Sequence, residues 1–196
     1  LARLGARAFV TGFMYDDNGR LFEQELHREG INYKFIWSHG RVRENYKFVD
    51  HKSMLTEFDY ISPEITAEKQ DDLIKFITEF APGCEAVFVA GGLAKGMTTD
   101  FYGRILSAVP ANVKKIVDSE GDRLRHALAC GVDLIKPNVE ELQRTLGITV
   151  KNRHTALEGA KTLVSMGAKK VLLSLGKEGA IITDGNKSYY CKSNNV

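Results

Sequence analysis

The sequence has little of several features, and each scarcity argues against a class of protein. It has three cysteines in 196 residues, and their unrelated spacings argue against a disulfide framework and a cysteine zinc site. No apolar run reaches the roughly 18 residues that a membrane-spanning helix needs. The formal net charge is only +2 and the basic residues are dispersed, so we expect no nucleic-acid partner and no membrane partner. Unpaired thiols are typical of a reducing compartment, so we expect a cytoplasmic protein.

What is present is the composition of a globular domain, with 43% hydrophobic and 27% charged residues. A chain of this length can bury one sizeable core. It opens at Leu1-Ala2-Arg3-Leu4-Gly5, which is typical of the last turn of a helix with a glycine just after its end. We therefore expect the printed residues to be an internal portion of a longer polypeptide.

From residue 86 onward, short apolar runs alternate with amphipathic helical patterns. Strands are expected at 86–90, 114–118, 133–136 and 170–174, and helices at 99–109, 122–130, 139–146 and after a capping pair at Thr155 and Glu158. Two last strands, at 180–183 and 187–191, flank Asp184-Gly185-Asn186, a strong hairpin turn. This alternation predicts an α/β fold with a mostly parallel sheet and helices on both faces. No linker or repeat is visible, so residues 1–196 are expected to form a single domain.

The first third of the chain has a different pattern. Residues 8–12 predict a strand, and Asp17 or Asn18 is expected to cap the helix that follows. Three further strands are expected near 32–37, 43–49 and 54–58, with no helical pattern between them. Consecutive strands of this kind are antiparallel, so we expect a small β lid beside the main sheet.

The stretch Lys136-Pro137-Asn138-Val139-Glu140-Glu141 carries the most informative local signal. Proline ends the preceding strand, because it lacks an amide donor and restricts Lys136 to extended conformations. Asn138 can then cap the next helix, and Glu141 stands where a capping-box carboxylate belongs. Plain helix capping explains this pair as well as a ligand site does. A ligand site is favoured by its place at the carboxyl end of a parallel strand.

Other loops follow strands at the same expected edge of the sheet. Glycines at 91–96 could bring backbone amides to a phosphate or carboxylate, or could serve packing alone. The turn at 174–180 could line a nucleotide or simply join two strands. Asp118 ends a further strand and could influence a metal or only cap a helix. In the lid, Arg43, Asn45 and Lys47 share one face by the period of two and could clamp a phosphate, unless that face is merely solvated.

Taken together, these segments resemble the ribokinase-like carbohydrate kinases, the phosphofructokinase-B family. They most resemble its phosphosugar branch, 1-phosphofructokinase and tagatose-6-phosphate kinase. The segments that carry the resemblance are Leu1-x-x-Leu4-Gly5, Gly12-Phe13 with Asp17 and Gly19, Glu29-Gly30-Ile31, Arg43-x-Asn45-x-Lys47, Gly92-Leu93-x-Lys95-Gly96, Asp118-Ser119, Lys136-Pro137-Asn138-x-x-Glu141-Leu142 and Ser174-Leu175-Gly176-x-Glu178-Gly179-Ala180. The last two are the most specific.

The resemblance implies a three-layer, Rossmann-like domain with a β lid that transfers the γ-phosphate of ATP to a phosphosugar hydroxyl with Mg²⁺. Fructose 1-phosphate or tagatose 6-phosphate is the favoured acceptor. The residues implied for ATP are Lys136, Asn138, Ser174, Gly176 and Gly179, and Glu141 is implied for the metal. The residues implied for the acceptor are Arg43, Asn45, Lys47, Gly91, Gly92, Lys95 and Gly96.

The sequence departs from the family pattern in places that affect the acceptor. Gly92 and Ala94 stand where the phosphate loop usually has Ser and Pro, and Asp118-Ser119-Glu120-Gly121 replaces an Asp-Thr-Ser-Gly-like segment. The family's Gly-Ala-Gly-Asp motif, which carries the catalytic base, is expected beyond Val196, so no base is named. The alternatives are a kinase for an unphosphorylated sugar or nucleoside, and an inactive relative that binds sugar phosphate or nucleotide. A homodimer through the β lid is a further expectation.

Overall fold

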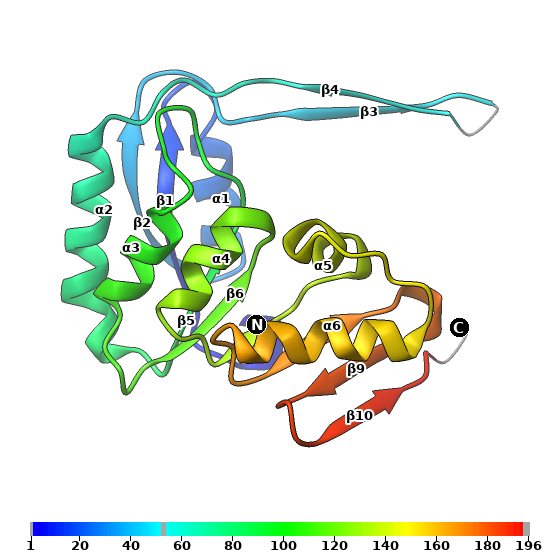
Figure 1. Ribbon diagram of the computed structural model, residues 1–196. Coiled ribbons are helices and arrows are strands. Elements are labelled where there is room, and N and C mark those ends of the chain that lie inside the picture. The colour runs from blue at the N-terminus through cyan, green and yellow to red at the C-terminus, as the bar shows by residue number, and fades with distance from the viewer. Residues whose placement is uncertain (1, 52–53, 194–196) are drawn as a thin grey trace. The chain divides into compact units, whose positions relative to one another are not determined.

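The computed structural model describes residues 2–51 and 54–193, which group into two compact units. The first unit extends to residue 73 and also includes residues 94–97, and the second contains the rest of the chain from residue 74 onward. Strands and helices occur in both units (Figure 1). Helix α2, Ala67–Phe80, begins in the first unit and ends in the second. The single domain expected from the sequence stays a prediction.

The first unit is built on a strand–helix–strand motif. Strand β1, Phe9–Tyr15, pairs in parallel with β2, Asn32–Ser38, and helix α1, Arg20–Arg28, connects them. Because the helix carries the chain back along the sheet, both strands run in the same direction. A short 3₁₀ helix, η1, Ala2–Leu4, ends at Gly5 with φ 83°, as expected for a helix end; Leu1 lies outside the described residues.

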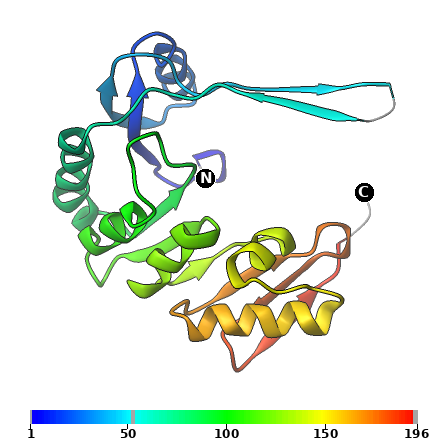
Figure 2. The same cartoon turned by 45° about the horizontal axis from the view of Figure 1, so that its top comes forward.

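The structure corrects the expected lid. Residues 32–37 belong to β2, which pairs with β1 instead of forming an antiparallel lid strand. The reason is that α1 completes a crossover unit, and such a unit needs a second parallel strand. Only β3, Asn45–Val49, and β4, Leu55–Asp59, form an antiparallel pair. We call this pair the lid hairpin, and Figures 1 and 2 show it extending from β1 and β2 as a two-stranded arm.

The second unit contains a six-stranded sheet in the order β10-β9-β8-β7-β6-β5. Its strands are β5 Ala86–Ala90, β6 Lys114–Asp118, β7 Leu134–Ile135, β8 Val171–Ser174, β9 Ala180–Thr183 and β10 Ser188–Cys191. Strands β5 to β8 are parallel, and β9 is antiparallel to both β8 and β10. The α/β class and the mostly parallel sheet are therefore confirmed.

The helices of this unit are α3 Phe101–Ala108, α4 Gly121–Ala129, α5 Val139–Leu146 and α6 Arg153–Ser165, with short 3₁₀ helices η2 Ala81–Gly83 and η3 Gly176–Glu178. Since β5 to β8 follow one another without reversal, right-handed crossovers place α3 to α6 on one face. Val117, Ile135 and Val171 point to that face and are fully buried. The opposite face exposes 53% of Phe88 and 37% of Ile182. Apolar side chains on both faces are typical of three-layer domains, and helices on this second face stay a prediction.

Two expected helix caps are wrong. Helix α6 starts at Arg153 and is capped by Asn152, whose side chain accepts a hydrogen bond from the Thr155 amide. Asparagine is a better N-cap than threonine, so the helix begins earlier than the pair at 155 and 158 suggests. Gly19 occupies the N-cap position of α1 without a side-chain bond, because Asn18 has partners elsewhere. No helix in the described part of the chain is long and apolar enough to cross a bilayer.

Candidate functional site at the carboxyl edge of the sheet

The loop after β7 presents polar groups at the start of α5. The Asn138 side chain accepts a hydrogen bond from the Glu141 amide at 2.9 Å, and Glu141 Oε2 accepts one from the Asn138 amide at 2.8 Å. The capping box predicted from the sequence is thus confirmed. It orients both side chains at a helix N-terminus, where the backbone amides and the helix dipole favour an anion. The same hydrogen bonds that cap α5 therefore also hold Asn138 and Glu141 in the positions that a ligand site would need.

The end of β8 lies directly beside this loop. The Ser174 amide donates to the Pro137 carbonyl at 3.0 Å, and Asn138 and Ser174 form a parallel bridge. Two segments about 36 residues apart, the stretch at 136–141 and the turn at 174–180, are thereby joined at the same edge of the sheet.

Tight glycine geometry shapes the turn after β8. The Leu175 amide donates to the Gly179 carbonyl at 2.8 Å, which closes the turn around η3. Gly179 has φ 111°, and a Cβ there would lie 2.0 Å from the Cys191 carbonyl oxygen. Gly176 has φ 59°, and a Cβ there would meet no atom within 4 Å. Only glycine fits at position 179, so the backbone conformation of this turn depends on that residue.

The neighbouring strand contributes a charged pair to the edge. Asp118 ends β6, and its Oδ2 lies 3.5 Å from Lys136 Nζ after β7. The backbone places them side by side, because the Lys136 amide donates to the Val117 carbonyl at 3.3 Å. Opposite charges are thus paired beside the capping box.

The glycine-rich loop expected to bind a phosphate is divided between the units. Gly91 follows β5 with φ 101° and belongs with Gly92 to the second unit. Lys95 and Gly96 belong to the first unit. There the Lys95 carbonyl accepts from the Ile65 amide at 3.0 Å, and the Gly96 carbonyl accepts from a glutamine on α2 at 3.3 Å.

Asn45 and Lys47 lie on one face of β3, as the period of two predicts, but Arg43 precedes β3, so the strand expected at 43–49 begins two residues later. Arg43 Nε donates to Asn45 Oδ1 at 2.8 Å. Lys47 Nζ lies 2.8 Å from the carboxylate of Glu57, its direct cross-strand neighbour. This face is therefore polar at Asn45 and Lys47, and it ends in the apolar pair Val49 and Leu55.

The other face of the lid hairpin is aromatic, a feature that the sequence analysis missed. Tyr46 lies opposite Phe58, and the rings of Phe48 and Phe58 meet edge-to-face with centroids 5.7 Å apart. The exposed fractions of Phe48 and Phe58 are 57% and 60%. The spacing of Tyr46 and Phe48, and of Phe58 and Tyr60, by two residues could have indicated this face.

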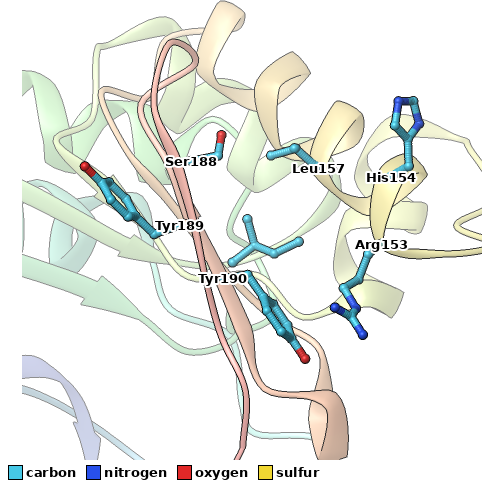
Figure 3. Close-up of a pocket in the computed structure, with 7 residues that line it drawn as sticks. Arg153, His154, Leu157, Ser188, Tyr189 and Tyr190 are labelled. Atoms are coloured by element: carbon cyan, nitrogen blue, oxygen red, sulfur yellow. The ribbon is translucent and has the colours of Figure 1, made fainter.

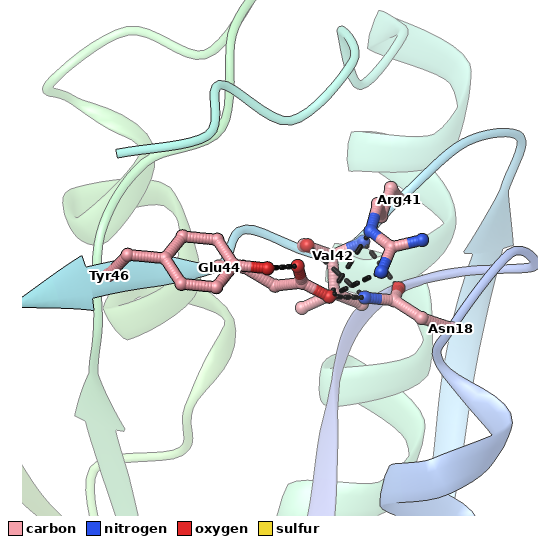
Figure 4. Close-up of polar contacts among 5 residues, drawn as sticks. All are labelled: Asn18, Arg41, Val42, Glu44 and Tyr46. Carbon is pink, nitrogen blue, oxygen red and sulfur yellow. Dashed lines mark hydrogen bonds and ion pairs between the residues drawn. The ribbon is translucent and has the colours of Figure 1, made fainter. Parts of the chain in front are cut away.

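A second network that the sequence did not reveal ties the lid hairpin to the β1–α1 turn (Figure 4). Asn18 Oδ1 accepts from the Val42 amide at 2.7 Å, and Asn18 Nδ2 donates to Glu44 at 2.9 Å. Glu44 also accepts from Arg41 Nη2 at 2.8 Å and from the Tyr46 hydroxyl at 2.6 Å. The hydrogen bond from Tyr46, followed by those from Arg41 and Asn18, lowers the pKa of Glu44. The carboxylate therefore stays charged and anchors the base of the lid hairpin.

A pocket of about 270 Å³ lies between the start of α6 and the β9–β10 hairpin (Figure 3). Its wall includes Arg153, whose guanidinium lies 4.2 Å from the centre of the Tyr190 ring. Arg153 Nε is 3.6 Å from the Glu178 carboxylate, and the Tyr190 hydroxyl donates to the Glu178 carbonyl at 2.5 Å. The pocket thus borders the turn that contains Gly176 and Gly179. No local motif marks it, because its walls come from segments far apart in the sequence.

Comparison with known proteins identifies the family of the chain. The family model for pfkB family carbohydrate kinases matches residues 1–196. The 1-phosphofructokinase of Haemophilus influenzae is 26% identical, over 92% of this chain and 58% of its own length. The 1-phosphofructokinase of Escherichia coli K12 is 28% identical, over 100% of this chain and 63% of its own length. The chain thus spans about three fifths of the length of these relatives.

Solved structures show the same fold. Escherichia coli phosphofructokinase-2 in complex with fructose-6-phosphate superimposes with a TM-score of 0.87 at 24% identity, covering 100% of this chain and 65% of that one. Its tetrameric inhibited form gives a TM-score of 0.84 at 23% identity, covering 96% and 63%. These likenesses confirm the ribokinase-like fold, and the family match extends over every residue of the sequence. The chain belongs to the pfkB family of carbohydrate kinases.

Proposed function

We propose that the protein transfers the γ-phosphate of ATP to a hydroxyl of a phosphosugar, with fructose 1-phosphate favoured over tagatose 6-phosphate. Family membership supports a carbohydrate kinase, and relatives named 1-phosphofructokinase support a phosphosugar acceptor. Phosphoryl transfer asks a protein mainly to position its substrates and to stabilise spreading negative charge. The proposal therefore depends on groups that can hold phosphates.

The junction of Asn138 and Ser174 is the observation that carries this proposal. The Ser174 amide donates to the Pro137 carbonyl at 3.0 Å, so the start of α5 and the η3 turn lie at one place on the sheet edge. A helix N-terminus and a glycine turn both offer amide donors, which suit the triphosphate of a nucleotide. We assign Lys136, Asn138, Ser174, Gly176 and Gly179 to ATP.

Glu141 is the residue that we assign to Mg²⁺. This ion is usually held by one or two carboxylates together with substrate phosphates and waters. The Glu141 carboxylate, fixed beside the Asn138 amide oxygen by the capping box, fits that mode. Within the described residues no group of three or more His, Cys, Asp or Glu forms an all-protein cage. When bound, the ion would neutralise phosphate charge.

The phosphate already on the acceptor is assigned to two sets of residues. One set is Asn45 and Lys47 on β3 together with Arg43 just before it, and an arginine fork suits a phosphate group. The glycine loop supplies Gly91, Gly92, Lys95 and Gly96. No base is assigned among these residues.

We further propose a homodimer formed through the aromatic face of the lid hairpin. Tyr46, Phe48, Phe58 and Tyr60 are each between 44% and 60% exposed, and a contiguous aromatic face of this kind is typical of an association site. The three free cysteines suit a reducing compartment, so we place the reaction in the cytoplasm.

The test is an acceptor panel assayed with the complete protein and MgATP. We expect turnover on fructose 1-phosphate, weaker turnover on tagatose 6-phosphate, and little on fructose or a nucleoside. Arg43→Gln should raise KM for the phosphosugar without raising KM for ATP, because it removes a phosphate contact. Preference for fructose or a nucleoside would contradict the phosphosugar proposal and indicate a kinase for an unphosphorylated sugar or nucleoside. Binding of sugar phosphate or ATP without any turnover would indicate an inactive relative.

A further inference from the structure

The Gly91 carbonyl, at the start of the glycine loop, is held by two side chains that no motif assigns. The Tyr102 hydroxyl on α3 donates to it at 2.6 Å, and Arg123 Nη1 on α4 donates to it at 3.2 Å. All three residues belong to the second unit. A single carbonyl oxygen at a strand end is therefore held by donors from two different helices.

Both donors are themselves held in place. Arg123 Nη2 lies 3.8 Å from Glu120 Oε1, and Glu120 Oε2 lies 2.7 Å from Arg144 Nη2 on α5. The Arg123 side chain is only 23% exposed. Tyr102 is 3% exposed, and burial raises the pKa of its hydroxyl, so it remains a donor at neutral pH. Glu120 stands in the segment Asp118-Ser119-Glu120-Gly121, which departs from the family pattern.

Fixing this carbonyl also fixes the amide that follows it. A trans peptide is planar, so the C=O of Gly91 and the N–H of Gly92 point in opposite directions. With the carbonyl turned toward Tyr102 and Arg123, the Gly92 amide points away from them. Among the described residues that amide has no backbone or side-chain acceptor. The loop therefore offers a donor with a set direction, as an anion site requires.

We propose that Arg123, together with Tyr102, is a positioning residue that directs the Gly92 amide toward the phosphate of the acceptor. Arg123 acts through the Gly91 carbonyl and not by touching the ligand. The identity of that ligand as a phosphosugar rests on the proposed function. The positioning role requires only a phosphate group.

Steady-state kinetics of the complete protein give the first test. Arg123→Gln should raise KM for the phosphosugar about five- to tenfold, the loss expected for one hydrogen bond of ordinary strength. Its kcat should change less than about twofold and KM for ATP should not change, because binding of the acceptor phosphate weakens equally in the ground state and the transition state. Tyr102→Phe should act in the same direction. Arg123→Lys should restore part of the loss, since lysine keeps one donor but not the fork.

Arg125→Gln is the matched control, because Arg125 lies on the same helix but pairs with Asp122 and the Thr145 carbonyl. It should leave KM for the phosphosugar unchanged. An equal rise in KM for Arg125→Gln and Arg123→Gln would mean that loosening α4 causes the effect, and would overturn the positioning role.

Titration with inorganic phosphate separates this role from the kinase proposal. The amide chemical shift of Gly92 should saturate in the wild-type protein, and Arg123→Gln should need about five- to tenfold more phosphate. Equal midpoints, or no response of Gly92 in the wild type, would overturn the positioning role. Saturation of Gly92 without turnover on any phosphosugar would overturn the proposed function and leave the positioning role supported.

Discussion

At the scale of single residues, backbone conformation separates two glycines of the same turn. Gly179 has φ 111°, and an added Cβ would meet the Cys191 carbonyl at 2.0 Å and the Ser193 amide at 2.7 Å. Gly176 has φ 59° and an added Cβ would meet nothing within 4 Å. Both positions disfavour a side chain, but only Gly179 also forbids one by close approach of backbone.

We therefore predict that Gly179→Ala lowers the free energy of unfolding by more than about 3 kcal/mol, because strain and a backbone clash add. Gly176→Ala should cost only about 1 kcal/mol, the ordinary left-handed penalty. Urea denaturation of the two variants and the wild-type protein measures both. Equal losses would contradict the close approach of residues 179 and 191.

At the scale of elements, two helices begin with the same device but at different places. Asn138 caps α5 with Glu141 as its partner, and Asn152 caps α6 with Thr155. The first cap lies at the proposed nucleotide edge, joined to Ser174. The chain thus supplies its own control for separating capping from ligand binding.

Asn138→Ala and Asn152→Ala should each lower the free energy of unfolding by about 1 kcal/mol, because each removes one cap. Only Asn138→Ala should lower kcat/KM for ATP. Asn138→Ser should keep the stability, since serine is also a good N-cap. It should still lower kcat/KM for ATP, because it lacks the side-chain amide. Unchanged ATP kinetics in Asn138→Ala would remove this residue from the nucleotide site. Denaturation and initial-rate measurements on the same preparations give both quantities.

Element boundaries were predictable where a local signal ends the element. The predicted limits of β6, α5 and β9, at 114–118, 139–146 and 180–183, agree with the structure. Proline at 137 and the turn at 184–186 stand next to two of these elements. The cap of α6 was misplaced, because Thr155 and Glu158 formed a plausible pair one turn too late.

At the scale of the whole molecule, the two faces of the lid hairpin have different chemistry. One face bears Asn45 and Lys47, and the other bears Phe48 and Phe58. A charged face suits a phosphate, and an exposed aromatic face suits burial in a subunit interface.

We predict that the complete protein sediments as a dimer and that Phe48→Ser with Phe58→Ser shifts it to monomer. The reason is that the double variant removes the central apolar area of the proposed contact. Tyr189→Ser is the control, because this β10 aromatic is 66% exposed and lies outside the lid hairpin. Sedimentation velocity over a concentration series measures the change. A wild-type monomer, or a double variant that remains dimeric, would contradict the interface.

The sequence by itself determined the α/β class, the order of most elements, the capping box at Asn138 and the face shared by Asn45 and Lys47. These features depend on groups within a few residues of one another, so periodicity and turn chemistry suffice. Only the tertiary structure decided that β2 pairs with β1, that Asn18 binds Glu44, and that Arg123 holds the Gly91 carbonyl. Those contacts join residues that are distant along the chain, and they form only when crossovers and packing bring their elements together.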